Sequence, residues 1–149
     1  MKRMKKILTL ILILSFIYHI TLIPTYAVES TTTYLDNGDY IVTEYTFSNP
    51  LARETTGGVI KETYYSSDNV AKFALILDAA FYYTYGVSAY ATSATATVQI
   101  YSTDASFISK KAYTSVNNAY AEAVIRYNTF EVPMKIQLSC NIYGDLYQA

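Results

Sequence analysis

Few residues of this sequence have side chains suited to catalysis. The chain has a single histidine, His19, in an apolar N-terminal segment, so residues 28–149 contain none. Ser–His and Cys–His catalysis, acid–base chemistry by histidine and the common zinc sites are therefore excluded from that part of the chain. An enzyme would need paired carboxylates, as in glycoside hydrolysis, or a serine activated by lysine. No such constellation is recognisable, and we expect neither a catalytic residue nor a cofactor.

Asp78 and Cys140 are the two single residues whose side chains are candidates for reactive groups. Asp78 is the one acid within the apolar run of residues 70–85, and an inward position would make it a candidate catalytic acid. Its even-numbered position instead places it on the solvent face. Cys140 is the only cysteine, so no internal disulfide can form, and it alternates with apolar residues of residues 134–142. This setting predicts a buried, inert thiol.

The segment Asp36-Asn37-Gly38-Asp39 has two interpretations. Asn-Gly is a strong turn signal, because both residues tolerate a positive φ. The aspartates also suggest calcium, but the longer loop and the distal glutamate that such a site needs are missing. We interpret the segment as a turn and predict no metal site.

The N-terminus has the features of a secretory signal peptide. Four of the first six residues are cationic, residues 7–23 are almost entirely apolar, and Pro24-Thr25-Tyr26-Ala27 ends the segment with small residues at the required positions. We predict cleavage after Ala27 and secretion of the remaining chain. An uncleaved membrane anchor is the alternative, because the apolar run approaches spanning length. Residues 28–38 should then form a loose N-terminal arm, and residues 39–149 a single domain.

The composition of residues 28–149 limits the partners. Seven Lys and Arg stand against twelve Asp and Glu, a net charge of −5. Nucleic acid and anionic membranes favour clustered cations, so neither is expected, and membrane contact is expected only through the signal segment before cleavage. Fifteen tyrosines and five phenylalanines, with abundant Thr, Val and Ala and no Trp, favour an all-β fold.

The longest regular pattern covers residues 70–85. Every odd-numbered position from Ala71 to Tyr85 is apolar or aromatic, and this period of two predicts one long strand with one buried face. Turn residues separate six further predicted strands, at residues 40–47, 59–65, 88–101, 106–113, 119–127 and 134–142. Residues 119–127 also have helical propensity, but their alternation favours a strand. Pro133 should lie at the start of the last strand.

About seven strands of this spacing predict an antiparallel β-sandwich of immunoglobulin-like size. Its core should combine one face of the long strand with one face of the last strand, namely Phe73, Leu75, Leu77, Phe81, Tyr83, Met134, Ile136, Leu138 and Cys140. Residues 88–101 are rich in Ala and Thr, and we expect the large side chains of residues 70–85 to pack over this thin strand.

Four segments of the sequence occur in a characteristic order. They are Lys-Glu-Thr-Tyr-Tyr-Ser-Ser-Asp-Asn (61–69), Phe-Tyr-Tyr-Thr-Tyr-Gly (81–86), Ser-Ala-Tyr-Ala-Thr-Ser-Ala (88–94) and Lys-Ile-Gln-Leu-Ser-Cys-Asn-Ile-Tyr-Gly-Asp-Leu (135–146). This order resembles a family of small secreted proteins of Gram-positive bacteria. The resemblance implies a β-sandwich without an assigned activity. Phe73 stands where the family usually has Trp, and Ala91 where a cysteine partner for Cys140 often occurs, so the family disulfide is not expected here.

These features favour a non-catalytic extracellular module that binds a protein or glycan of the cell envelope or of the extracellular medium. Tyrosine offers rigid, amphipathic contact area, and four tyrosines are the candidate exposed binding residues: Tyr64, Tyr65, Tyr82 and Tyr90. The plainer interpretation is that tyrosine suits any strand surface. A bacteriocin- or toxin-like effector and a surface subunit that assembles through strand edges are alternatives. A carboxylate-based hydrolase is a further one.

Overall fold

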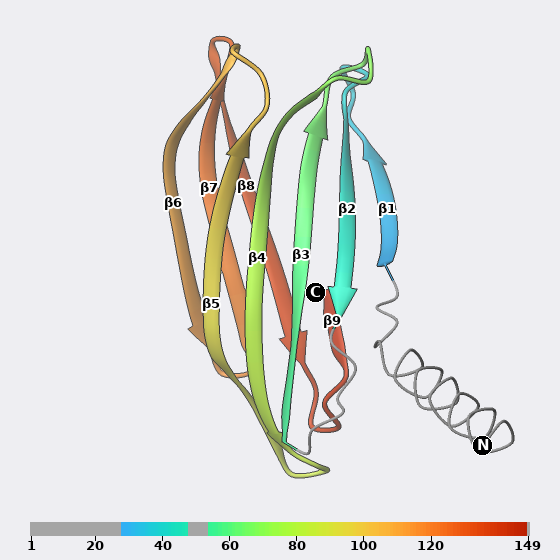
Figure 1. Cartoon of the computed structure of the whole chain (residues 1–149), viewed down its shortest axis with the longest axis vertical. Coiled ribbons are helices and arrows are strands. Elements are labelled where there is room, and N and C mark those ends of the chain that lie inside the picture. Colours follow the sequence, from blue (N-terminus) through green and yellow to red (C-terminus); the bar gives the residue numbers. More distant parts are fainter. Residues whose placement is uncertain (1–27, 48–53, 149) are drawn as a thin grey trace, which may run out of the picture.

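The computed structural model describes residues 28–47 and 54–148, which form two antiparallel β-sheets packed against each other (Figure 1). The first sheet has five strands: β1 (Val28–Tyr34), β2 (Tyr40–Phe47), β3 (Thr55–Tyr65), β4 (Ala71–Thr84) and β5 (Ser88–Ile100). The second sheet has four: β6 (Ala105–Ser115), β7 (Asn118–Tyr127), β8 (Phe130–Cys140) and β9 (Leu146–Gln148). This architecture confirms the all-β sandwich, with two more strands in the described part than expected.

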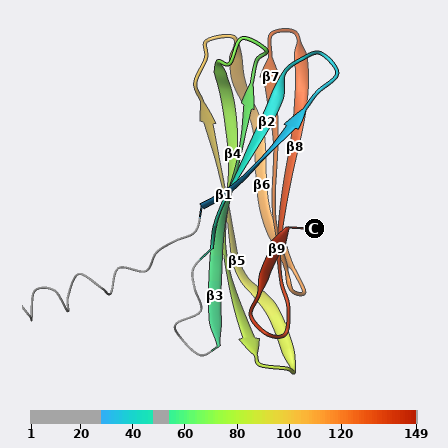
Figure 2. The same cartoon turned by 90° about the vertical axis from the view of Figure 1, so that its right-hand side faces the viewer.

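The strands follow one another in space as they do in the sequence. Neighbours in each sheet are consecutive strands, and residues 101–104 carry the chain from the first sheet to the second. In Figure 2, where the β1 edge faces the viewer, the two sheets form separate layers. The second layer is one strand narrower than the first.

The alternation of residues 70–85 sets the core. On β4 the odd-numbered side chains point between the sheets, and Phe73, Leu75 and Leu77 are completely buried, whereas Asp78 is exposed on the outer face. The same alternation on β7 buries Ala119, and its continuation confirms a strand rather than a helix there. All nine residues expected in the core are buried, and Cys140 is a free thiol whose burial raises its pKa to about 11.

Residues 28–34, expected to be a loose arm, form strand β1. Their Thr-rich sequence has no apolar alternation, and residues 29–34 are exposed on both faces. The strand is ordered by its ladder with β2, in an unbroken register from Val28–Thr46 to Tyr34–Tyr40. Backbone pairing leaves no sign in a hydrophobic pattern, so the sequence interpretation was wrong here.

The thin strand β5 does not lie beneath the aromatic row of β4, as was expected, but beside it in the same sheet. Its small side chains lie at the rim of the core, where Ala91, Ala94 and Val98 are only partly buried. The residues that pack against β4 come instead from β7 and β8 of the second sheet, among them Ile136.

Pro133 lies inside β8, not at its start, and pairs with Val124. The backbone N–H of Cys140 points to β7, because it donates to Asn117 O at 3.0 Å. Amide directions alternate along an antiparallel strand, so the odd positions of β8 point away from β7. The backbone of residue 133 therefore faces the β9 side of β8. Because β9 covers only Leu138–Cys140, no strand lies opposite residue 133 there, and proline removes no hydrogen bond from the sheet.

Gly144 allows the final turn to close over the core. Its φ of +88° is a left-handed conformation, and a Cβ there would lie 2.6 Å from Cζ of Tyr83. Glycine is required on both counts, since no L side chain fits the backbone angle or the space without strain.

The predicted signal peptide, with its cleavage site after Ala27, lies outside the described residues. Within residues 28–47 and 54–148, no helix has the length and apolarity to cross a bilayer.

Candidate functional site

Tyr64, one of the four candidate binding tyrosines, is a core residue. It is 5% exposed, stacks on Phe73 at 4.8 Å between ring centroids, and meets Tyr127 edge-on at 5.5 Å. The expectation of an exposed ring was wrong, because on β3 the even-numbered side chains face inward together with Ile60. The polar Glu62 on this same face concealed the pattern in the sequence.

Tyr65 lies on the outer face of the first sheet, in a row of three rings across β1, β2 and β3. It stacks on Tyr40 with centroids 5.0 Å apart and planes 3° apart, and Tyr40 lies 5.7 Å from Tyr34. The Tyr40 hydroxyl also donates to Asn69 Oδ1 at 3.1 Å. Such cross-strand pairs stabilise a sheet.

Tyr82 and Tyr90 form a second pair on the same face, with ring centroids 5.2 Å apart. Tyr82 donates to Glu54 Oε2 at 2.8 Å, which raises its pKa, and Tyr90 is 46% exposed. Tyr65 pairs with Ala71 at one end of β4, and Tyr82 is eleven residues further along. At about 3.3 Å per residue, the two tyrosine pairs are on the order of 35 Å apart. The four candidate tyrosines therefore do not form one surface.

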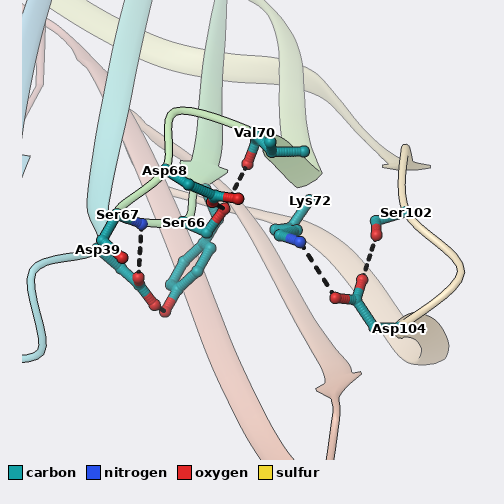
Figure 3. A network of polar contacts seen from close by, with 9 residues as sticks. Asp39, Ser66, Ser67, Asp68, Val70, Lys72, Ser102 and Asp104 are labelled. Atoms are coloured by element: carbon teal, nitrogen blue, oxygen red, sulfur yellow. Dashed lines mark hydrogen bonds and ion pairs between the residues drawn. The ribbon is translucent and has the colours of Figure 1, made fainter.

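Three loops at one end of the sandwich each contain an aspartate that accepts hydrogen bonds (Figure 3). Asp39, before β2, accepts hydrogen bonds from the Tyr64 hydroxyl at 2.5 Å and from the Ser67 amide at 2.9 Å. Asp68 accepts from Ser66 in the next loop. The 36–39 segment is a turn, as predicted, with Gly38 at a φ of +87°.

In the third of these loops, Asp104 accepts a hydrogen bond from Ser102 and lies 3.1 Å from Lys72 Nζ. The hydrogen bond from Ser102, followed by Lys72, lowers the pKa of Asp104, and Asp104 in turn raises the pKa of Lys72. Asp39 thus connects two loops, Asp68 is bonded within its own loop, and Asp104 fixes the third loop to Lys72 of β4. In the described part of the chain, no three His, Cys, Asp or Glu side chains are grouped so that they could hold a metal ion.

The outer face of the second sheet carries a cluster of charge and aromatic rings that sequence reasoning missed. Tyr113 and Tyr120 stack at 4.7 Å, and Tyr113 donates to Glu122 Oε1 at 2.6 Å. Lys111 and Lys135 flank Glu122 at 3.9 and 3.5 Å and lie over the two rings. The hydrogen bond from Tyr113, followed by the lysines, lowers the pKa of Glu122. A shallow hollow of about 680 Å³ adjoins these lysines, but the charges of the cluster are already paired with one another.

Glu62 is the inward-facing carboxyl that sequence reasoning also missed. It lies on the face of β3 shared by Ile60 and Tyr64, and burial raises its pKa. Gln148 Nε2 is 3.5 Å from its Oε1, and Gln148 also accepts a hydrogen bond from Tyr45. Ile60 lies two residues before Glu62 on the same strand, so strand alternation would have placed both side chains on the inner face. Asp78, by contrast, is on the solvent face as expected, and neither acid has a second carboxylate among its hydrogen-bonding partners in the described ranges.

The two sheets have four edges, and three of them are protected against a further strand. The outermost strand of the second sheet is β9, which covers only Leu138–Cys140 of β8. Beyond β9 the edge is formed by β8, whose outward position 133 is proline and is followed by Lys135. On β6 the register with β7 breaks between Phe107 and Ser109, directly before Lys110. The β5 edge is bent by a register shift at Ala80/Phe81 and donates from its Ala91 amide to Val116 O at 2.8 Å. Proline, lysine and bulges are the devices by which sheet proteins block edge pairing.

The fourth edge, β1, has none of these devices. It contains no proline or lysine, its only charge is Glu29, and its seven-residue register with β2 is unbroken. The Leu35 amide donates to Asp39 O at 2.8 Å, so the N–H and C=O groups of the odd-numbered residues of β1 point toward β2. Alternation then directs the N–H and C=O groups of Val28, Ser30, Thr32 and Tyr34 outward. This edge is a ready template for a strand.

Comparison of the chain with family models, with curated proteins and with solved structures gives no match. The family resemblance of its sequence therefore remains an expectation, whereas the two-sheet antiparallel fold is established by the strands themselves.

Proposed function

We propose that this chain is a secreted, non-catalytic interaction module, which takes an extended segment of a partner protein as an added strand along β1. The observation that carries the proposal is the contrast between the edges. The β5 and β6 edges have a bulge, and the last edge has only the three-residue β9 beside Pro133 and Lys135 of β8. β1, by contrast, presents four residues with unblocked, outward backbone groups. Strand addition uses such groups for affinity and the alternate side chains for specificity.

The energetics of β1 favour the same interpretation. Ordering a backbone residue costs roughly 1–2 kcal/mol, and a strand usually offsets this cost by burying one face. Residues 29–34 are exposed on both faces, because the narrower second sheet does not reach beneath them. A partner strand would supply the hydrogen bonds and the side-chain contacts that the sandwich does not.

The tyrosine clusters support this proposal less directly. Many of their hydroxyls are already bonded within the chain, as in Tyr40–Asn69, Tyr82–Glu54 and Tyr113–Glu122. Tyr34 differs, because it is 76% exposed and lies on β1 itself, where its ring extends the row of Tyr40 and Tyr65. It would contact the side chains of an added strand.

The test uses the chain recovered from the medium of a producing culture, which should begin at Val28 and thus contain every strand of the sandwich. Immobilised chain is presented with displayed random dodecapeptides. Peptides rich in the β-branched residues of extended strands should be enriched. A Thr32→Pro variant should no longer bind them, because proline removes the outward amide at residue 32. Thr32→Val, which keeps that amide, is the matched control. Enriched peptides that bind both variants equally, or no enrichment, would refute strand addition at β1.

A further inference from the structure

The partner strand can be specified, and its identity rests on the proposed function of the β1 edge. We propose that the occupant is β1 of a second copy of this chain, paired antiparallel about a twofold axis that passes midway between the two copies of Thr31. The two five-stranded sheets then join into one continuous sheet of ten strands. Their outer faces lie on one side, and the two four-stranded sheets lie on the other.

The direction of the backbone groups selects the register. Val28, Ser30, Thr32 and Tyr34 present N–H and C=O groups to the free edge, so hydrogen-bonded pairs must join even positions to even positions. Pairing Ser30 with Thr32 of the second copy, and Val28 with its Tyr34, uses all four residues of both strands. A shift by two residues in either direction leaves at least one outward residue of β1 without a partner within the strand.

The side chains of β1 are compatible with this register. Thr31 meets its own symmetry mate, and Ser30 meets Thr32, both of which are favourable cross-strand combinations. Glu29, the only charge on the strand, falls opposite Thr33 and not opposite its own copy. Like charges directly opposite each other would oppose self-pairing, and this register avoids them.

The protected edges limit the assembly to two copies. A twofold contact uses the same patch on both chains and closes on itself. Growth into a filament would need a second open edge. β6 carries a bulge and Lys110, and β5 is bent toward the turn at Val116. The remaining edge consists of the three-residue strand β9 and of β8 with Pro133, and a strand as short as β9 gives little pairing. A single strand pair is a small contact, so we expect a weak dimer whose population rises with concentration.

Sedimentation equilibrium of the chain from Val28 on tests the dimer. The molar mass should rise with concentration toward twice that of the monomer and no further. Thr32→Pro should remain monomeric at every concentration, and Thr32→Val should dimerise like the unmodified chain. Equal melting temperatures of the two variants would show that proline has left the sandwich intact. Species larger than a dimer, or a dimer that Thr32→Pro does not affect, would overturn the proposal.

Cross-linking tests the register. Directly opposed residues in a non-hydrogen-bonded pair have Cα atoms about 4.5 Å apart, within the range of a disulfide, so Thr31→Cys should form a covalent dimer on mild oxidation. Thr33 is four residues from its own mate in this register, about 13 Å at 3.3 Å per residue, so Thr33→Cys should not. The unmodified chain, whose only thiol is the buried Cys140, should stay uncross-linked. Equal cross-linking of both variants would overturn the register.

The two proposals fail in different ways. A chain that stays monomeric, with Thr31→Cys unlinked, overturns the second copy as occupant. If displayed peptides still bind in a manner that Thr32→Pro abolishes, the β1 edge remains the site and takes a different protein. If the proline also has no effect on peptide binding, the proposed function itself is wrong.

Discussion

The hydroxyl of Tyr64 donates to Asp39 Oδ2 at 2.5 Å, and this bond connects the core of the sandwich with the turn that leads into β2. The second carboxylate oxygen of Asp39 accepts from the Ser67 amide at 2.9 Å. Asp39 is itself 8% exposed, so its carboxylate depends on these partners rather than on water. Two loops that are far apart in sequence are thereby held at one end of the molecule.

Replacing Tyr64 with phenylalanine should destabilise the fold measurably. The change keeps the ring stack on Phe73 but leaves the buried Asp39 carboxylate without one of its donors, a loss of about 1–3 kcal/mol. Tyr40→Phe is the matched control, because its hydroxyl bonds to Asn69 at the exposed surface and should contribute within about 0.5 kcal/mol. Urea unfolding of both variants at neutral pH provides the comparison.

The same variant has a signature at alkaline pH. Burial, followed by the hydrogen bond to Asp39, raises the pKa of Tyr64 from 10.0 to about 12. The folded chain therefore binds this proton more tightly than the unfolded chain, and its contribution to stability is complete below pH 10 and is lost as pH rises toward 12. Tyr64→Phe should flatten the decline of unfolding free energy over that window. An unchanged alkaline profile would contradict the role assigned to this hydroxyl.

Two glycines with similar backbone angles should respond differently to alanine. Gly86 has a φ of +72° and nothing near its absent Cβ, so Gly86→Ala incurs only the left-handed strain, roughly 1–2 kcal/mol. Gly144→Ala has the same strain and also drives a methyl group into the Tyr83 ring, which should add about 1–3 kcal/mol. Thermal unfolding of the pair isolates the packing contribution. Equal losses would mean that Tyr83 can move aside freely.

The register of β4 can be tested with two residues three positions apart. Phe81 is 1% exposed and Asp78 lies on the opposite, solvent face. Phe81→Ala should cost about 3–5 kcal/mol, which is much of the stability of a typical domain, because it opens a cavity between the sheets. Asp78→Ala should stay within about 0.5 kcal/mol. A Phe81→Ala protein that melts within a couple of degrees of the unmodified chain would place this side chain outside the core.

The parts of the fold that depend on burial could be predicted from sequence, and the parts that depend on backbone pairing could not. Residues 70–85 show their buried face because large apolar residues repeat at every second position. The neighbouring Tyr64 and Tyr65 give no such signal, because Glu62 interrupts the inner face of β3. Burial can be inferred from a pattern only where the pattern is uninterrupted.

The candidate site was beyond sequence reasoning for a related reason. Residues 28–34 have no apolar alternation, and their importance depends on which amides point away from β2, a property of the register alone. Pro133 and Lys110 are visible in the sequence, but their protective effect requires knowledge of which strands form edges. The four tyrosines were chosen by residue type, and type does not distinguish a core ring from a surface pair.

The consecutive order of the strands has a consequence for how the chain folds during its synthesis. Each sheet is made from one continuous segment of the chain, so every strand pairs with its sequence neighbour and neither sheet has to wait for a strand of the other. The first sheet can pair completely once Ile100 has emerged, but the residues that cover its apolar face arrive only with β7 and β8. Aggregation should compete most strongly with folding after the first sheet has emerged and before β7 and β8 cover it.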